Sequence, residues 1–236
     1  TLGYGGHSSE ILKRIKKGHL YAFDQDEEAI AFSSGRLSEI GDNFTIIHAN
    51  FANLKEELEK RGITKVDAIL FDLGVSSPQL DEADRGFSYH QDAKLDMRMD
   101  QTQALSAYDV VNTFEEAELA DIFYRYGEEK FSRSIAKNIV AARREHPIET
   151  TLELAEIIKN SVPERVRRAS HPARKVFQAI RIYVNRELEV LEIALQDALS
   201  ILAIDGHISV ITFHSLEDRI VKNKFKEVTE VDPVLK

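Results

Sequence analysis

The chain has a glycine loop at residues 3–6, where Gly3, Gly5 and Gly6 occupy three of four positions. Glycine lets the backbone bend sharply and approach a ligand closely because it has no side chain. A helical pattern follows, and then an apolar strand that ends in Asp24, 21 positions after Gly3. A glycine loop that opens a helix, with an acid about 20 residues later at a strand end, is typical of nucleotide-binding sites. The sequence therefore predicts that this loop binds a nucleotide-like ligand and that Asp24 accepts hydrogen bonds from its ribose.

Two further strands are predicted to end at the same edge of the sheet. Residues 44–48 and 66–71 are short apolar runs, which Phe51 and Asp72 follow. A near-continuous apolar run is expected of a parallel strand covered on both faces, and ligands bind at the carboxyl ends of such strands. We therefore expect the glycine loop, Asp24, Phe51 and Asp72 to lie close together.

The spacing of the glycines discriminates among the ligands that such a loop can bind. A dinucleotide loop of the G-x-G-x-x-G type needs a third glycine where this chain has Ser8, so a nicotinamide-dependent oxidoreductase is the weaker alternative. A P-loop is excluded because no Gly-Lys-Ser/Thr follows the glycines. S-adenosylmethionine needs glycines and a ribose-binding acid but no pyrophosphate cradle. It is the favoured cofactor, and Asp72 is then a candidate catalytic residue near the sulfonium and the acceptor.

Cysteine is absent from the 236 residues, which excludes disulfides, thiolate metal sites and a cysteine nucleophile. We identify no metal-binding set and expect no metal. No apolar run approaches the ~18–20 residues of a membrane span, and we expect a cytoplasmic protein without membrane contact. Because the chain starts inside the glycine motif, we expect it to be part of a longer protein.

The alternation of strands and helices is interrupted once. Between residues 105–173 the apolar spacing is helical throughout, and afterwards a long helix and a strand at 208–213 follow. We therefore expect an α/β sheet domain in two parts, 1–104 and 174–236, with an all-helical domain inserted between them. The last strand runs into His214, for which a general base and a structural hydrogen bond are the two interpretations.

Motifs along the whole chain resemble those of the MraW (RsmH) family of bacterial 16S rRNA (cytosine-N4)-methyltransferases. They occur in the family's order at residues 1–8 (TLGYGGHS), 23–26 (FDQD), 72–80 (DLGVSSPQL), 85–89 (RGFSY), 95–100 (LDMRMD), 126–132 (YGEEKFS), 171–173 (HPA) with 177–179 (FQA), and 213–219 (FHSLEDR). The chain departs from the family pattern at Ser170, where glycine is usual, and at Arg186, where an acid is usual. The resemblance implies a class I, Rossmann-like S-adenosylmethionine methyltransferase sheet with a helical insert that recognises the substrate.

The resemblance also implies which side chains bind the cofactor. These are Gly5, Gly6, His7, Asp24, Phe51, Asp72 and Gln79. The backbone of Gly5 and Gly6 would lie against the methionine part, and Asp24 would accept both ribose hydroxyls. Phe51 would pack on the adenine, unless it is a core aromatic residue. His7 would touch the cofactor or cap the helix.

The resemblance implies a possible role in RNA binding for the basic segment, residues 165–186. It holds seven Lys and Arg and no acidic residue, in a chain of net charge −9. Either it is a solvated helix face, or it contacts RNA phosphates. The candidate RNA-binding residues are Arg165, Arg167, Arg168, Arg174 and Lys175, together with Arg85 earlier in the chain. Phe87 and Tyr89 are candidates for stacking on an extruded base, with core packing as the alternative.

The implied partner is 16S rRNA or the small ribosomal subunit, and the implied reaction is methylation of the exocyclic N4 amine of a cytosine. A non-catalytic RNA-binding assembly factor that keeps the cofactor fold is a further alternative. The oligomeric state is left open, with a homodimer as one option.

Overall fold

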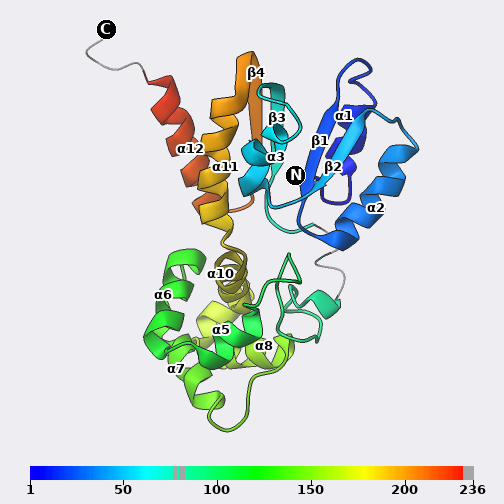
Figure 1. The fold of residues 1–236 in the computed structure, drawn as a ribbon. Helices are drawn as coiled ribbons and strands as arrows, with labels where there is room; N and C mark the ends of the chain where they lie inside the picture. The colour runs from blue at the N-terminus through cyan, green and yellow to red at the C-terminus, as the bar shows by residue number, and fades with distance from the viewer. Residues whose placement is uncertain (77–78, 80–82, 231–236) are drawn as a thin grey trace. The chain divides into compact units, whose positions relative to one another are not determined.

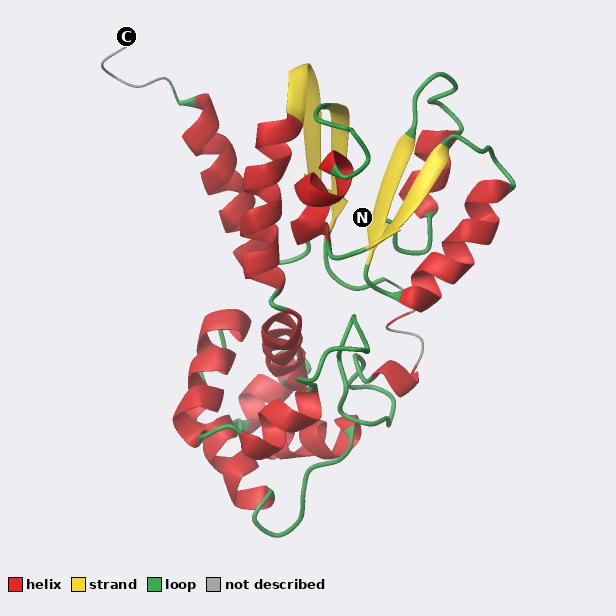
Figure 2. Cartoon of the chain, viewed as in Figure 1, coloured by secondary structure: helices red, strands yellow, loops and turns green. Residues whose placement is uncertain are grey.

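The computed structural model describes residues 1–76, 79 and 83–230 (Figure 1). The chain forms two compact units, which we call the sheet unit (residues 1–74 and 187–236) and the helical unit (residues 75–186). Strands occur in the sheet unit, whereas the helical unit is built from helices and loops (Figure 2).

The described strands of the sheet unit form two parallel pairs. They are β1 (Leu20–Asp24) with β2 (Phe44–His48), and β3 (Val66–Asp72) with β4 (Leu202–Ile211). The pairing places Asp24 opposite His48 and Asp72 opposite Ile211. The first three strands lie where the apolar runs predicted them. The fourth begins six residues earlier than the predicted 208–213, and its pairing is irregular near Val66.

Thr1 and Leu2 hydrogen-bond to both strand pairs. The Leu2 N–H donates to the Phe23 carbonyl at 2.8 Å, and the Thr1 nitrogen donates to the Leu70 carbonyl at 3.2 Å. The Asp72 N–H donates to Thr1 Oγ1 at 2.9 Å. The start of the chain therefore lies against β1 and β3, and the glycine loop that follows is delivered to the carboxyl ends of both strands.

Helices cover the strands of the sheet unit and bury its core. They are α1 (Gly6–Leu12), α2 (Glu27–Ser38), α3 (Leu54–Glu59), α11 (Glu187–Ile201) and α12 (Ser215–Thr229), with the short 3-10 turn η1 (Phe51–Asn53). In α11 the buried positions Leu191, Ala194, Leu195 and Ala198 recur every three or four residues, as expected of a helix packed on a sheet. They share one apolar cluster with Phe71 of β3.

The helical unit packs around a second apolar cluster. Its helices are α5 (Ala107–Thr113), α6 (Glu116–Gly127), α7 (Ser132–Ala142), α8 (Thr151–Asn160), α9 (Glu164–Ala169) and α10 (Ala173–Asn185), and η2 (Ala83–Arg85) precedes them. The Thr150 side chain caps α8, because it accepts from the Glu153 N–H at 3.3 Å. The reciprocal half of a capping box is replaced, since Glu153 accepts from the Glu149 N–H.

The boundaries of the units differ from the expected 105 and 173. Phe87, Leu95 and Met97, in the irregular stretch before α5, are buried in the core of the helical unit. Gly86 makes this possible, since a Cβ atom there would lie 2.4 Å from the Lys94 carbonyl oxygen. Helix α10 buries its apolar face in the same core. The helical unit therefore begins earlier and ends later than helical spacing alone suggested.

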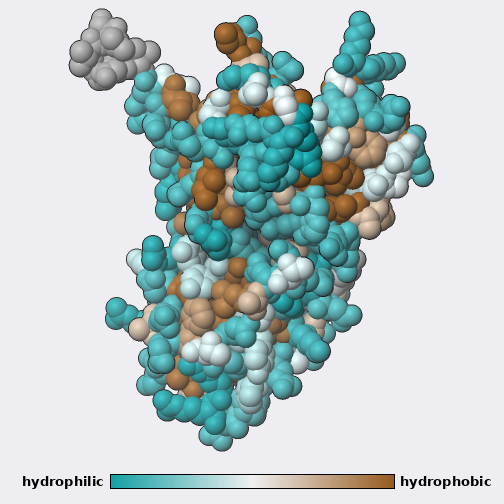
Figure 3. All heavy atoms as spheres, in the orientation of Figure 1, coloured by the Kyte–Doolittle hydropathy of each residue, from teal (hydrophilic) through white to brown (hydrophobic). Residues whose placement is uncertain are grey.

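None of the helices in the described residues is long and apolar enough to cross a membrane. On the face drawn in Figure 3 hydrophilic residues predominate and hydrophobic ones lie in small separate areas. This surface agrees with a chain in which 30% of the residues are charged.

Candidate functional site

The glycine loop is tied to Asp24 at the end of β1. The Gly3 N–H donates to Asp24 Oδ2 at 2.8 Å, and the Asp26 N–H donates to Asp24 Oδ1 at 3.0 Å. Ser33 of α2 donates through its hydroxyl to the Gly3 carbonyl at 2.7 Å. The predicted pairing of the loop with an acid 21 residues later is therefore a direct contact.

Asp24 keeps capacity to bind a further ligand. Burial raises the pKa of its carboxyl above the ordinary value of 3.8, and the hydrogen bonds from Asp26 and Gly3 oppose this rise. An ionised carboxylate oxygen has two acceptor positions, and each Asp24 oxygen uses one of them in the two bonds named above. One position on each oxygen is therefore available to a pair of ligand hydroxyls.

Gly5 and Gly6 have different reasons to lack a side chain. Gly5 has φ +76° and caps α1, and a Cβ atom there would lie 3.2 Å from Ser33 Oγ. The backbone conformation at Gly5 and its packing against Ser33 therefore require glycine, whether or not a ligand binds. At Gly6 a Cβ atom would meet nothing within 4 Å, so the space beside it is open. A ligand that approaches the backbone of the glycine loop closely needs such an open space.

His7 and Asp72 form a side-chain pair across the site. His7 Nδ1, on α1, lies 3.1 Å from Asp72 Oδ2 at the end of β3. The two side chains are 53% and 36% exposed, so a ligand can reach both. The His7 side chain does not cap α1, whose N-cap is Gly5. The expected convergence of the glycine loop with Asp24 and Asp72 is therefore present.

Phe51 opens η1, directly after β2, and is half-buried. Its ring lies 5.5 Å from that of Phe71, and it packs against the core of the sheet unit. Phe51 thus packs in the core, which was the alternative to packing on the adenine. Beside it, Asn50 Nδ2 donates to Gln25 Oε1 at 2.8 Å and joins the segments that follow β1 and β2. Gln25 and Asn50 were not singled out from the sequence, although each stands next to a predicted strand end.

Gln79 is buried and belongs to the helical unit, where its Oε1 accepts from the Ser76 N–H at 3.0 Å. The neighbouring motif residues Ser77, Pro78 and Leu80 lie outside the described residues.

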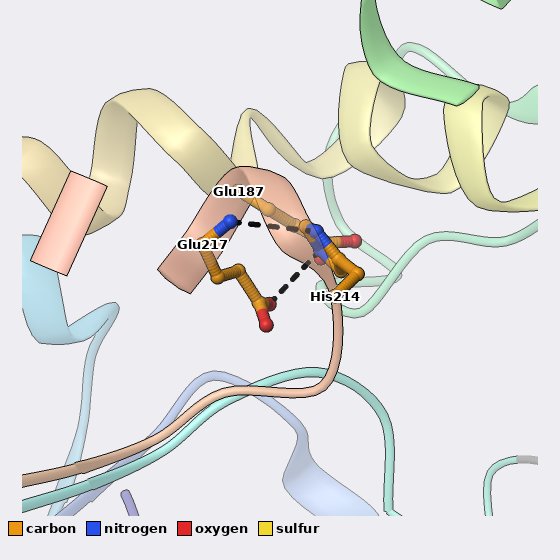
Figure 4. Close-up of side chains that lie close together, drawn as sticks. All are labelled: Glu187, His214 and Glu217. Carbon is orange, nitrogen blue, oxygen red and sulfur yellow. Dashed lines mark hydrogen bonds and ion pairs between the residues drawn. The ribbon is translucent and has the colours of Figure 1, made fainter. Parts of the chain in front are cut away.

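His214 lies in a cluster with Glu187 and Glu217 at the starts of α11 and α12 (Figure 4). As the N-cap of α12, His214 accepts from the Glu217 N–H through Nδ1 at 3.4 Å. Its Nε2 lies 3.1 Å from Glu217 Oε1, but no hydrogen-bond partner satisfies this nitrogen among the described residues. The His214 and Glu217 side chains are 9% and 3% exposed. The structural interpretation of His214 thus has a contact to support it.

The ligand atoms of this cluster lie within 4.8 Å of one another, a spacing that a metal ion could bridge. In a neutral imidazole one nitrogen carries the proton and the other accepts. Since Nδ1 of His214 accepts the Glu217 N–H, the proton belongs on Nε2, the nitrogen that faces the carboxylates. Metal binding would have to reverse this tautomer and disturb the cap of α12. The cluster is therefore better suited to fixing the start of the helix.

Arg85 does not face solvent in the structure. It is 6% exposed, and its guanidinium donates to the Arg98 and Met99 carbonyls and lies over the Phe87 ring. Phe87 is itself 5% exposed in the core. Arg85 thus fastens the loop of the helical unit, and the alternative of core packing holds for Phe87. Nothing in the sequence distinguished Arg85 from an RNA-binding arginine, because its carbonyl partners are set by the fold of the loop.

The basic segment presents cations beside a pocket of the helical unit. The pocket measures about 620 Å³, and Tyr89, Lys159, Arg167, Arg168 and His171 contribute to its walls. Tyr89 and His171 stack with ring centroids 4.5 Å apart. Burial lowers the pKa of His171, as do His90 and Lys159 nearby, which favours the neutral ring.

The remaining candidate RNA-binding residues differ in their exposure and in their hydrogen-bond partners. Arg165 and Arg174 are exposed, whereas Lys175 is half-buried and donates to the Glu128 carbonyl. Arg168 pairs with Glu164, and Arg167 donates to the Val162 carbonyl. The exposed pair between Arg168 and Glu164 is weak enough for a phosphate to compete with it.

A glycine loop held by an acid at the end of β1, beside a second acid at the end of β3, is the arrangement expected of the cofactor site in an α/β methyltransferase. The chain belongs to the MraW methylase family, whose model matches residues 1–235. The enzyme is a methyltransferase, and the methyl donor of this family is S-adenosylmethionine.

Similar proteins carry the same name in several bacteria. A "Ribosomal RNA small subunit methyltransferase H" of Exiguobacterium sibiricum is 59% identical over 228 residues, covering 96% of this chain and 73% of the relative. A protein of that name from Limosilactobacillus fermentum is 56% identical, covering 98% of this chain and 74% of the relative. One from Lactobacillus delbrueckii subsp. bulgaricus is 54% identical, with coverages of 98% and 76%.

Proposed function

We propose that this protein transfers the methyl group of S-adenosylmethionine to the exocyclic N4 amine of a cytosine in 16S rRNA of the small ribosomal subunit. The observation that carries the proposal is the joining of the glycine loop to two strand-end acids, through Gly3 to Asp24 and through His7 to Asp72. The names of the relatives support a ribosomal substrate. A cytoplasmic location follows from that substrate.

The proposed architecture is one class I, Rossmann-like sheet to which both strand pairs belong, with the helical unit as its insert. Two features support it. All the described strand pairs are parallel, and the N-terminal residues hydrogen-bond to β1 and β3. The helical unit also lies between the two parts of the sheet unit in sequence.

In the proposed cofactor site each residue has a distinct task. Gly5 and Gly6 leave the backbone accessible to the methionine part, as the open space beside Gly6 supports. Asp24 accepts the ribose hydroxyls with its remaining lone pairs, and the free side of Phe51 packs on adenine. Asp72 lies on the acceptor side.

The chemistry assigned to Asp72 follows from the acceptor. When bound, S-adenosylmethionine supplies an electrophilic methyl group on a sulfonium. The cytosine amine is a weak nucleophile because its lone pair is delocalised into the ring, so the protein must align it and accept its N–H. The Asp72 carboxylate would accept that N–H and so stabilise the positive charge that the nitrogen gains as the methyl group passes to it from the sulfonium, which leaves as a neutral thioether. The proton is then released to His7 or to water. His214 has a structural role instead, as the cap of α12.

The helical unit supplies the proposed RNA-binding surface. Exposed Arg165, Arg168 and Arg174 offer charge to phosphates, and Arg167 and Lys175 extend the same segment. Phosphate contacts of this kind position a nucleic acid without reading its sequence. We propose 16S rRNA or the small subunit as the partner.

The direct experiment is transfer of a labelled methyl group to small ribosomal subunits from a strain that lacks this methylation. We expect incorporation into 16S rRNA, located at a cytosine N4 by nucleoside analysis, and loss of incorporation in Asp72→Ala. Incorporation at another base would contradict the proposal that a cytosine is the methyl acceptor. RNA binding without incorporation would favour the assembly-factor alternative.

A further inference from the structure

Phe213 follows β4 and is 68% exposed. Single exposed apolar residues are common, so the position of the ring carries more weight than its exposure. The β3–β4 register pairs Asp72 with Ile211 at the ends of the two strands, and Gly74 and Phe213 stand two residues beyond these ends. A Cβ atom on Gly74 would lie 3.5 Å from Phe213 Cδ2, which is ordinary van der Waals contact. Since Leu73 alone separates Gly74 from Asp72, the Phe213 ring lies near the end of β3 that carries Asp72.

The backbone that carries this ring is firmly held. The Phe213 N–H donates to Glu217 Oε2 at 2.8 Å, and Glu217 is 2% exposed. His214, the next residue, caps α12 through the Glu217 N–H. The cluster in Figure 4 thus fixes the turn from which Phe213 projects. An exposed ring on a fixed backbone loses little conformational freedom when a ligand packs on it.

We propose that Phe213 is the platform on which the acceptor base stacks, so that its exocyclic amine is held beside Asp72. This inference rests on the proposed function. A cytosine can present N4 to the methyl donor when it leaves its helical stack, and extruded bases are held by aromatic or apolar side chains. Phe87 is buried and Tyr89 stacks on His171, so the sequence-based candidates for this task are engaged elsewhere.

Phe213 and Asp72 then divide the work of recognition. The phenyl ring has no hydrogen-bonding group and supplies apolar contact area to any base. Discrimination for a base with an exocyclic amine comes from the Asp72 carboxylate, which accepts an N–H but repels a carbonyl oxygen. Phe213 is in this sense a positioning residue for the methyl transfer.

The test is a series of substitutions at Phe213 assayed with labelled methyl donor and small subunits. We expect Phe213→Ala to lower kcat/KM by about 5- to 150-fold, the range for loss of one stacked base, whereas Phe213→Tyr and Phe213→Trp keep most activity. Phe213→Leu preserves bulk without an aromatic face and should resemble Phe213→Ala. Calorimetry should give the wild-type dissociation constant for S-adenosylmethionine in all four variants.

Three outcomes would overturn the inference. In one, Phe213→Ala is as active as wild type; in another, Phe213→Leu matches Phe213→Tyr, so that bulk alone matters. In the third, Phe213→Ala weakens S-adenosylmethionine binding tenfold, which would place the cofactor on the ring. An inactive wild type would instead refute the proposed function, so the two failures are distinguishable. Unchanged thermal unfolding of each variant excludes a loss of fold, as expected for an exposed side chain.

Discussion

His7 Nδ1 lies 3.1 Å from Asp72 Oδ2, so the first helix of the chain and the end of β3 meet through a pair of titratable side chains. The pair is partly exposed, and its direct contribution to stability is small, of the order of 0–1 kcal/mol. Its position between the glycine loop and the strand end gives it a role in the reaction instead. An imidazole beside a carboxylate can orient it and take up the proton that the acceptor releases.

The first prediction concerns Asp72. Asp72→Ala should lower the single-turnover rate of methyl transfer by about 10²–10⁴-fold, the range for loss of a group that holds a proton in the transition state. Asp72→Asn keeps the shape but loses the charge and should be nearly as slow. The rate should fall less in His7→Ala, because this variant keeps the Asp72 carboxylate and removes only the imidazole beside it. Equal rates for wild type and Asp72→Ala would remove Asp72 from the chemistry.

Asp24 provides a test of the cofactor site. Asp24→Ala should weaken S-adenosylmethionine binding by about 1.5–3 kcal/mol, the range for hydrogen bonds to a charged group. Titration calorimetry measures this directly. Asp24→Asn is the matched control, since its amide oxygen can still accept one hydrogen bond and should give an intermediate loss. An unchanged dissociation constant in Asp24→Ala would exclude contact with the ribose.

The raised pKa of Asp24 predicts a pH dependence with opposite signs for binding and stability. Cofactor binding needs the ionised carboxylate, so affinity should fall as pH drops through a pKa above the ordinary 3.8. For stability, the folded state holds this proton more tightly than the unfolded state. The contribution of Asp24 is therefore fully present below pH 3.8 and is lost as pH rises through the folded pKa. Asp24→Asn should lack both dependences in parallel calorimetric and unfolding titrations.

Gly5 and Gly6 should separate folding from binding. Gly5→Ala places a Cβ atom in a left-handed conformation and against Ser33, and should lower the free energy of unfolding by about 1–2 kcal/mol. Gly6→Ala meets open space at the start of a helix and should leave unfolding unchanged or slightly improved. If the cofactor lies beside Gly6, the same variant should nevertheless bind S-adenosylmethionine more weakly. Normal binding by Gly6→Ala would show that the open space is not used.

The basic segment predicts a salt-dependent interaction. The triple variant Arg165/Arg167/Arg168→Ala should bind 16S rRNA more weakly, with a slope of log affinity against log salt reduced by about 2, because phosphate contacts release fewer counterions. Cofactor affinity should stay constant. Lys13/Lys16/Lys17→Ala removes the same charge from exposed positions of the sheet unit and serves as the control. Equal losses in the two triple variants would indicate a non-specific effect of net charge.

The sequence by itself determined the features that depend on neighbours along the chain. The apolar runs predicted β1, β2 and β3, because a strand covered on both faces needs continuous apolar residues. The 21-residue spacing of Gly3 and Asp24 predicted that both belong to one ligand site, and in the structure a hydrogen bond joins them directly.

Tertiary structure decided what depends on residues far apart in sequence. An arginine next to aromatic residues has the same local pattern whether it is exposed or, like Arg85, enclosed by backbone carbonyls 13 and 14 residues later. Helical spacing could not assign residues 85–99 to a unit, because an irregular loop joins a core through packing rather than periodicity. Phe213 reads as the end of an apolar strand, and only the fold shows that its ring is exposed and lies next to Gly74, just after the end of β3.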